Sequence, residues 1–333
     1  MELVLEFERP LVELRRRVAG LRQAELAQGV DLGASIRELE RQADLLQKQI
    51  LANLSPWQRT LLSRHPTRPY TLDYAAAWLS EAVELHGDRA GYDDKAIVGM
   101  VGEFRGRTIV LIGHQKGRTT MENVTRNFGM ALPDGYRKAL RLMRLADRFG
   151  LPIVTLIDTP GAYPGIDAEA RGQAEAIARN IMEMAALRVP VICCVIGEGG
   201  SGGALALGVG NRVLMLENTT YSVISPEGCA AILWHDRAEG PRAAEALKLT
   251  AQDCLRLGVA DALVDEPGGG AHRMPEESIR NLGDAVAANL DSLAALDGAQ
   301  LREDRYQRFR RLGAIDDRGN DIAEGPAPSH PPE

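Results

Sequence analysis

The sequence is poor in cysteine, and its four cysteines are not spaced as metal ligands. They are Cys193, Cys194, Cys229 and Cys254, and no two of them form the CxxC pair of a zinc ribbon. Two of the four fall inside the apolar run 191–196, which favours a buried strand. We therefore expect reduced cysteines and no metal bound by this chain.

The sequence also lacks an excess of positive charge and any membrane-spanning apolar run. Its formal net charge is -7, which argues against general nucleic-acid binding because that function needs a basic face. The first residues, 1–6, include acids where a signal peptide would have a basic region. No apolar run approaches the ~20 residues that a membrane helix needs. These absences predict a cytoplasmic protein with no membrane contact.

The N-terminal part, residues 1–68, predicts a helical extension. Apolar residues recur at steps of three and four over 34–54, which is typical of a helix with one packing face. Pro66 and Pro69 predict a linker, and a second helix is expected at 74–85.

From residue 69 to 315 the pattern predicts one domain of alternating strands and helices. Short apolar runs indicate buried strands, and the helices between them place those strands parallel. Ligands of such sheets bind beyond the carboxyl ends of the strands. The tail 316–333 is rich in proline and predicts disorder. The expected strands are 96–101, 108–112, 152–157, 191–196, 212–217, 221–224 and 262–264, and the expected helices are 134–149 with Asp134 as N-cap, 168–187 and 275–312.

The glycine-rich segment Gly197–Gly203 predicts a loop that opens a helix, and it fits three functions. Gly197, Gly199 and Gly202 satisfy the GxGxxG pattern of dinucleotide-binding folds, and Glu217 ends the next strand about 20 residues on. This first interpretation is an NAD-dependent oxidoreductase.

The second interpretation is a serine hydrolase. Gly199, Ser201 and Gly203 satisfy the GxSxG pattern of a nucleophile elbow. Asp261 or Asp265, followed by His272, would complete the order serine, acid, histidine. The competing explanation of Ser201 is a small turn residue among glycines.

The third interpretation needs no side-chain chemistry. Glycines before a helix leave backbone N–H groups free, and the helix dipole favours negative charge there. Such amides stabilise an oxyanion that forms during a reaction. The loop Asp158–Gly165, which follows the neighbouring strand, is expected to face this segment. The motif alone does not choose among the three functions.

Longer motifs resemble one family closely, the carboxyltransferase alpha subunits of bacterial multi-subunit acetyl-CoA carboxylases. Motifs of this length and number are more specific than a single glycine pattern. The resemblance covers roughly residues 35–315. The matching stretches are Gly87–Ala90, Asp93–Gly99, Ile112–Arg118, Arg126–Met130, Gly135–Ala139, Ile157–Gly165, Gly172–Asn180, Ile196–Leu205 and Tyr221–Cys229.

The resemblance implies a ClpP/crotonase-like fold of repeated ββα units. It implies carboxyl transfer from N1-carboxybiotin, carried on biotin carboxyl carrier protein, to acetyl-CoA, giving malonyl-CoA for fatty-acid synthesis. It further implies a crotonase-fold beta subunit as partner, two copies of each chain, a site shared between them, and biotin carboxylase and ATP binding in the larger complex. Acetyl-CoA is expected mostly on the beta side.

On this interpretation the backbone amides of Gly202, Gly203 and Ala204 form the oxyanion hole for the ureido oxygen of biotin. A side chain at Gly203, as in Gly203→Val, is expected to block that hole and to leave the fold largely intact. His114 is expected to be structural, and Glu198 and Glu227 to cap helices. The other predicted substrate-binding residues are Gly161, Ala162, Tyr163, Gly199, Gly200 and the two cations Lys116 and Arg118, for which a solvated basic turn is the alternative.

Overall fold

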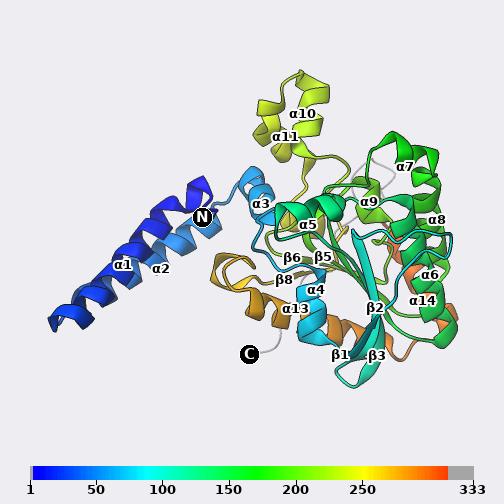
Figure 1. Ribbon diagram of the computed structural model, residues 1–333, viewed down its shortest axis with the longest axis horizontal. Coiled ribbons are helices and arrows are strands. Elements are labelled where there is room, and N and C mark those ends of the chain that lie inside the picture. The colour runs from blue at the N-terminus through cyan, green and yellow to red at the C-terminus, as the bar shows by residue number, and fades with distance from the viewer. Residues whose placement is uncertain (1–2, 314–333) are drawn as a thin grey trace, which may run out of the picture.

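The computed structural model describes residues 3–313, and its centre is one eight-stranded sheet (Figure 1). The strand order is β1-β2-β3-β4-β5-β6-β8, and β7 pairs with the end of β5. Strands β1, β2 and β3 are antiparallel, and the remaining pairs are parallel. The strands are β1 (Ser80–Glu84), β2 (Ile97–Phe104), β3 (Arg107–His114), β4 (Ile153–Thr159), β5 (Val191–Gly200), β6 (Arg212–Leu216), β7 (Thr220–Ser222) and β8 (Ala262–Val264).

Both faces of the sheet are buried, as the apolar strands predict. In β4, Ile153 and Ile157 join one core cluster, and Val154 and Leu156 join the other. Alternate residues of a strand point to opposite faces, so a strand covered on both faces is apolar throughout. Helices α6 (Pro133–Phe149) and α8 (Gln173–Ala186) contribute to the first cluster, and α4 (Thr71–Trp78) and α13 (Pro275–Leu293) to the second. The predicted α/β class is confirmed.

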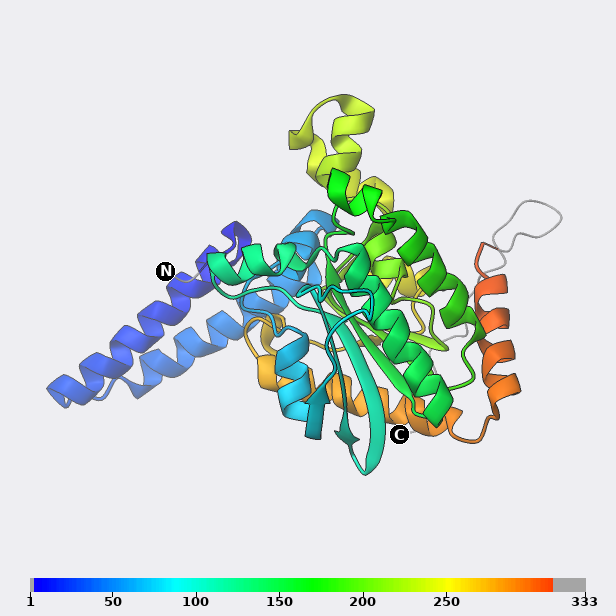
Figure 2. The ribbon, with the colours of Figure 1, turned by 45° about the vertical axis from the view of Figure 1, so that its right-hand side comes forward.

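The N-terminal extension is a hairpin of two helices that projects from the body (Figures 1 and 2). After a short turn η1 (Glu6–Glu8), α1 (Arg9–Gln28) packs against α2 (Gly33–Ala52). The helix predicted at 34–54 is therefore confirmed. The buried residues of the pair are Leu11, Val18, Ile36 and Ala43.

The linker predicted around Pro66 and Pro69 is an irregular connection between two helices. It is packed against the body, because Arg68 is 1% exposed and its Nη2 lies 2.7 Å from Glu266 Oε1. The next prediction is wrong. The helix predicted at 74–85 ends at Trp78 and is followed by β1, whose five residues are all exposed. This edge strand is defined by backbone pairing with β2 and has no apolar alternation of its own.

The helix predicted at 168–187 is broken in two. Gly172 has φ 82°, a left-handed conformation that ends α7 (Ile166–Ala170) and begins α8. The prediction missed this break because the apolar residues on either side keep a helical spacing.

The helix predicted at 275–312 is also two helices, α13 and α14 (Gly298–Arg310). Asp297 caps α14 by accepting bonds from the amides of Ala299 and Gln300. The predicted N-cap Asp134 is wrong by two positions, because Leu132 is the N-cap of α6 and Pro133 its first residue.

The remaining helices lie mostly near the carboxyl ends of the strands, and α10 and α11 project there as a lobe (Figure 1). No helix in residues 3–313 combines the length and apolar character needed to cross a membrane. The predicted disordered tail, 316–333, lies outside the described residues. The remaining helices are α3 (Pro56–Ser63), α5 (Thr120–Thr125), η2 (Asn127–Gly129), α9 (Ser201–Leu205), α10 (Pro226–Trp234), η3 (Arg237–Glu239), α11 (Gly240–Leu247), α12 (Ala251–Arg256) and η4 (Pro267–Gly269).

Candidate functional site

The glycine-rich segment is half strand and half helix, where the sequence predicted a loop. Strand β5 continues through Gly200, and α9 begins at Ser201. Gly199 and Gly200 pair with Tyr221 and Ser222 of β7. The backbone therefore turns sharply at Ser201, whose φ of 52° is left-handed and unusual for a serine.

The two predicted loops meet through their backbones. A Cβ atom on Gly200 would lie 2.2 Å from the carbonyl oxygen of Pro160. A Cβ atom on Gly203 would lie 2.7 Å from the amide nitrogen of Ala162 and from the carbonyl carbon of Gly161. Both distances are too short for real atoms, so only glycine fits at these two positions. The structure brings Gly161 and Ala162 against Gly203, and their role in binding stays a prediction.

Backbone amides at the start of α9 are available as donors. The first N–H groups of a helix have no acceptor within the helix. Within the described residues, the amides of Gly202, Gly203 and Ala204 donate to no group outside α9. Ala162 likewise donates no backbone hydrogen bond there. The helix is only five residues long, so local amides matter more here than a macrodipole.

Lys116 lies beneath this segment, paired with a buried carboxylate. Its Nζ is 2.6 Å from Asp158 Oδ1, and the same oxygen accepts the amide of Glu198 at 3.0 Å. A Cβ on Gly197 would lie 2.3 Å from Asp158 Oδ1, which explains that glycine. Burial alone would lower the pKa of Lys116, but Asp158 and Glu198 raise it above its ordinary value. Lys116, which was predicted to contact a substrate anion, is therefore already paired with the carboxylate of Asp158.

Arg118 is engaged in structural contacts. Its guanidinium stacks 4.0 Å from the centre of the Tyr70 ring, and it pairs with Asp73. It also donates to the carbonyl oxygens of Pro66 and Arg68 at 2.6 and 2.9 Å. The predicted anion-binding role of Arg118 has no support in this geometry, because the side chain ties the start of α4 to the turn after β3.

The two glutamates predicted to be helix caps are both paired with Arg64, which follows α3. Arg64 Nη2 is 2.8 Å from Glu198 Oε1, and its Nη1 is 2.6 Å from Glu227 Oε1. The cap of α10 is Ser225, whose Oγ accepts the amide of Gly228 at 3.1 Å. The capping prediction is therefore wrong for Glu227. Arg64 itself was missed, because it lies far from its partners in sequence.

Two buried polar side chains beside the glycine segment were not predicted as site residues. The hydroxyl of Tyr136 on α6 would lie 3.0 Å from a Cβ on Gly203. The ring of His114, at the end of β3, lies beside the backbone of Leu156 and Gly203. Neither the Tyr136 hydroxyl nor either ring nitrogen of His114 has a side-chain hydrogen-bond partner in the described residues. His114 is fully buried, and its structural role stays a prediction.

Burial keeps both groups uncharged. It lowers the pKa of His114 to about 4 and raises the pKa of Tyr136. The carboxyl edge thus presents backbone amides and neutral polar groups around Gly203, and the nearby charges are paired. Such an arrangement suits stabilisation of negative charge on a substrate oxygen.

The depressed pKa of His114 predicts acid sensitivity. In the unfolded chain this histidine takes up a proton near pH 6.5, whereas the folded chain resists until about pH 4. The free energy of unfolding should therefore fall as the pH drops through this window, by about 2 kcal/mol between pH 7 and pH 5. The His114→Gln protein should lose this part of the pH dependence. The measurement is urea unfolding of both proteins at pH 7 and at pH 5. Parallel profiles of the two proteins would contradict the assignment.

Within residues 3–313, one cluster has metal-ligand geometry. One ligand atom each of Glu8, His65 and His272 lies within 4.8 Å of the others. Glu8 Oε1 is, however, 2.6 Å from Arg273 Nη2 and 3.2 Å from His272 Nε2. Burial would raise the pKa of Glu8, but these two partners lower it to about 2. The cluster is accounted for as a buried ion-pair network that fastens the N-terminal hairpin. All four cysteines are free thiols.

The two alternative functions lose their structural basis. The strands follow one another across the sheet without the reversal of order that a dinucleotide-binding fold requires. For the hydrolase, Asp261 pairs with Arg308 and His272 with Glu8. Within the described chain, Ser201 Oγ forms no hydrogen bond with a base, and His272 is engaged by Glu8. The strand-to-helix turn at Ser201 has the backbone form of a nucleophile elbow, but within the described residues no acid and histidine are assembled beside it.

Three exposed apolar side chains lie on segments that follow the carboxyl ends of strands. Ile166 is 85% exposed, and Leu205 and Val223 are also exposed. Each follows the end of a different strand, β4, β5 and β7. Exposed apolar residues grouped around a site are typical of a surface that a partner covers. We call these three residues the apolar rim.

Comparison with known proteins relates this architecture to one family. The family described as acetyl co-enzyme A carboxylase carboxyltransferase-like matches residues 4–313. The chain is 58% identical over 311 residues to the acetyl-coenzyme A carboxylase carboxyl transferase subunit alpha of Thermus thermophilus, covering 93% of this chain and 98% of that protein. It is 56% identical over 313 residues to the protein of that name from Synechococcus elongatus, covering 94% and 96%.

Solved structures share the fold at low sequence identity. Transcarboxylase 12S superimposes with a TM-score of 0.56 and 20% identity, over 68% of this chain and 42% of that chain. The beta subunit of geranyl-CoA carboxylase from P. aeruginosa gives 0.55 and 18%, over 74% and 46%. Both are crotonase-like carboxyltransferases, and the predicted fold class is confirmed.

Proposed function

Because the chain belongs to the family of acetyl-CoA carboxylase carboxyltransferase alpha subunits, we propose that it receives carboxybiotin and transfers its carboxyl group to acetyl-CoA, giving malonyl-CoA. The observation that carries the proposal is the backbone contact between Gly203 and Ala162, where amides of two loops gather beside neutral polar groups. We assign the activity to the cytoplasm.

The residues at the carboxyl edge fit a planar ureido group better than a charged ligand. The glycines keep the space beside the amides free of side chains, and the charges of Lys116 and Glu198 are already paired. The unpartnered hydroxyl of Tyr136 is a further polar group at the same edge. A neutral, donor-rich pocket favours a group whose oxygen becomes negative only during reaction.

Carboxybiotin, when bound, would supply both the carboxyl group and the base that removes a proton from the acetyl methyl group. The part of this chain is to hold the ureido oxygen with the amides of Gly202, Gly203 and Ala204. Gly161, Ala162 and Tyr163 line the same side. The amides are set by the backbone, so no reorganisation is needed as charge develops.

The apolar rim favours a partner that completes the site. We assign this partner as a beta subunit of the same fold, with two copies of each chain, and expect it to hold most of the acetyl-CoA. Biotin carboxyl carrier protein would bring the carboxybiotin, and biotin carboxylase would load it. Burial of Ile166, Leu205 and Val223 would remove apolar surface from water, which stabilises an interface.

Substitution of Ser201 tests the proposed chemistry. With backbone donors, Ser201→Ala should reduce carboxyl transfer by about tenfold or less, because alanine keeps the donor amides and only shifts the loop slightly. A nucleophilic serine would instead lose all turnover. The measurement is malonyl-CoA formation by the assembled complex at saturating acetyl-CoA.

Labelling with a serine-directed phosphonate is the matching direct test. We expect no covalent adduct on Ser201 in the native chain. Background activity of Ser201→Ala in a folded and fully assembled complex, or a stoichiometric adduct, would contradict the proposal and favour the hydrolase.

A further inference from the structure

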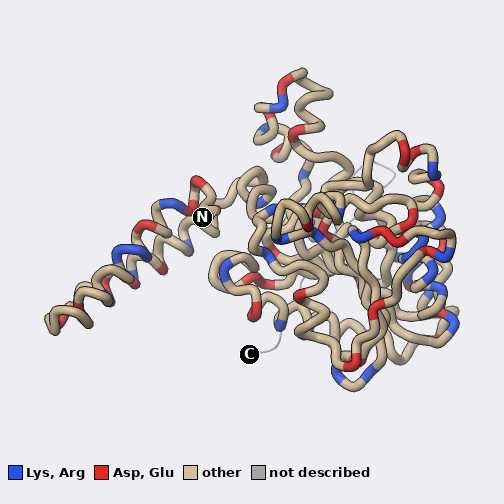
Figure 3. The backbone as a smooth tube through the Cα atoms, viewed as in Figure 1, with Lys and Arg blue, Asp and Glu red and all other residues tan. Residues whose placement is uncertain are grey.

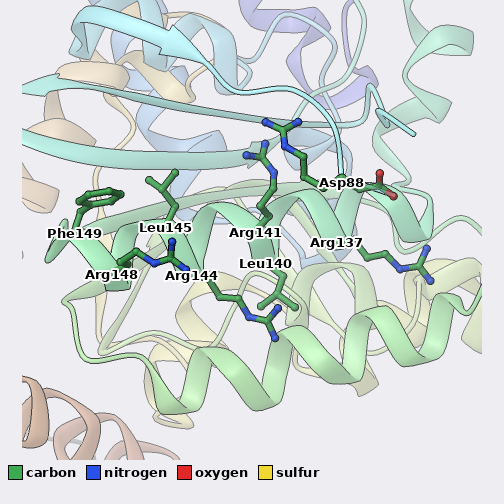
Figure 4. Close-up of a pocket in the computed structure, with 9 residues that line it drawn as sticks. Asp88, Arg137, Leu140, Arg141, Arg144, Leu145, Arg148 and Phe149 are labelled. Carbon is green, nitrogen blue, oxygen red and sulfur yellow. The ribbon is translucent and has the colours of Figure 1, made fainter. Parts of the chain in front are cut away.

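A second concave surface lies along α6, away from the carboxyl edge. It is a cleft with a volume of about 490 Å³, lined by Arg89, Arg137, Arg141, Arg144 and Arg148 and closed at one end by Phe149 (Figure 4). Helix α6 begins beside the carboxyl edge and ends just before β4 starts. Its arginines therefore lead towards the opposite edge of the sheet. We call this surface the arginine cleft.

Four of the arginines form a single stripe on the helix. Positions 137, 141, 144 and 148 are separated by four, three and four residues, the spacing of one helical face. The stripe is about 16 Å long at 1.5 Å per residue. Positive charge gathers on this side of the molecule (Figure 3).

This positive charge is poorly balanced. Within the described residues, only Arg144 of the five pairs with a carboxylate, that of Glu183. Arg89 and Arg137 donate to the carbonyl oxygens of His86 and Arg171. Like charges four residues apart destabilise a helix, so an ordinary exposed face would intersperse acids. A bound anion would relieve this repulsion.

The one carboxylate inside the cleft is turned to its own loop. Asp88 Oδ1 accepts the amides of Ala90 and Tyr92 at 2.7 and 3.0 Å. Its contribution is to shape the loop that carries Arg89.

The centre of the cleft is held in a fixed geometry. Arg141 donates to the carbonyl oxygens of Leu85, His86 and Gly87 at 3.3, 3.1 and 3.0 Å. Burial, and then the charge of Arg89, lowers the pKa of Arg141. An arginine anchored in this way loses little conformational entropy when it binds a ligand.

We propose that the arginine cleft binds a small molecule with two or more phosphate groups, a nucleoside diphosphate or triphosphate or a coenzyme that contains one. Several guanidinium groups within 16 Å match several phosphates, and arginine recognises phosphate with paired hydrogen bonds. The volume lies in the usual range for small-molecule sites. Phe149, 68% exposed, offers a flat apolar surface to a base.

The concave shape favours such a ligand over an acidic protein, which would need a broader flat surface. The proposal is independent of carboxyl transfer, because the cleft shares no residue with the glycine segments. The ligand would therefore bind in addition to the substrates of carboxyl transfer, for example as a regulator.

The test is calorimetric titration of the purified full-length chain with AMP, ADP and CoA at low salt. ADP should bind saturably at one per chain, at least about tenfold more tightly than AMP, and should weaken as salt is added. Arg148→Glu should weaken ADP binding by at least about tenfold, since it removes one phosphate contact and adds repulsion. The matched control is Arg302→Glu, the same charge change at an exposed site on α14, which should leave binding unchanged.

The outcomes are separable. CoA binding that is at least about tenfold tighter than ADP binding and is weakened by Arg148→Glu would identify the coenzyme as the ligand of the cleft. Equal binding of ADP and CoA, weakened by the same variant, would identify the shared diphosphate as the group that is recognised; either result supports the proposal. The side chain of Arg148 is exposed and forms no hydrogen bond in the described chain, so its substitution should not disturb folding, which circular dichroism would verify. No saturable ADP binding at millimolar concentration, equal binding of AMP and ADP, or unchanged binding by Arg148→Glu would overturn it. So would binding of an acidic partner protein in place of all three nucleotides.

Discussion

The purified chain alone should form no malonyl-CoA above background, and addition of a crotonase-fold beta subunit should restore turnover. Two oxygens become negative during the proposed reaction, and this chain offers one group of backbone donors, around Gly203. Loss of a single oxyanion donor costs about 10²–10³ in rate. Loss of the positioned acetyl-CoA costs far more, because a bound reactant corresponds to an effective concentration of about 10⁵ M or above. The measurement is malonyl-CoA formation by each chain separately and by the mixture.

The apolar rim supplies the matched variants for this experiment. Ile166→Asp places a charge on a side chain that is 85% exposed, so folding should be unaffected and assembly should weaken. Met182→Asp makes the same kind of change at an exposed site on α8 away from the rim, and assembly should be retained. Robust turnover by the isolated chain would contradict the shared site. Normal assembly of Ile166→Asp would move the interface elsewhere.

Gly203→Ala should reduce carboxyl transfer by about 10²–10³ or more, the cost of losing a positioned donor. The added Cβ would lie 2.7 Å from the backbone of Gly161 and Ala162, so the two loops must move apart. The shift is confined to the two loops, so the fold as a whole is still expected to stay largely intact. A displacement of about 1 Å is enough for a loss of this size.

Gly202→Ala is the control, because it adds the same methyl group one residue earlier. Its Cβ would lie 3.6 Å from Ile177, an ordinary contact, and the donor amide remains. We expect near-normal turnover of this variant. Both proteins would be compared in the assembled complex, with circular dichroism to verify folding. Equal activities of the two variants would contradict the central place of Gly203.

Much of the fold follows from local sequence patterns. Strand β4 and the start of β5 are apolar runs bounded by proline and glycine, and Gly150 ends α6 with a left-handed φ of 68°. The errors fall where local patterns carry no information. Residues 80–84 are a strand only because β2 offers its edge, and Gly172 interrupts a spacing that otherwise continues.

The sequence by itself determined the class of the fold, the two glycine segments and the family, because each is a property of neighbouring residues. The tertiary structure alone decided the environment of those segments. It paired Lys116 with Asp158, joined Glu198 and Glu227 through Arg64, and placed Tyr136 against Gly203. The hydrogen-bonded pairs Lys116–Asp158, Arg64–Glu198 and Arg64–Glu227 join residues that are 42, 134 and 163 positions apart. Such contacts leave no periodicity or motif in a single sequence, because they arise only when the sheet brings distant strand ends to one edge.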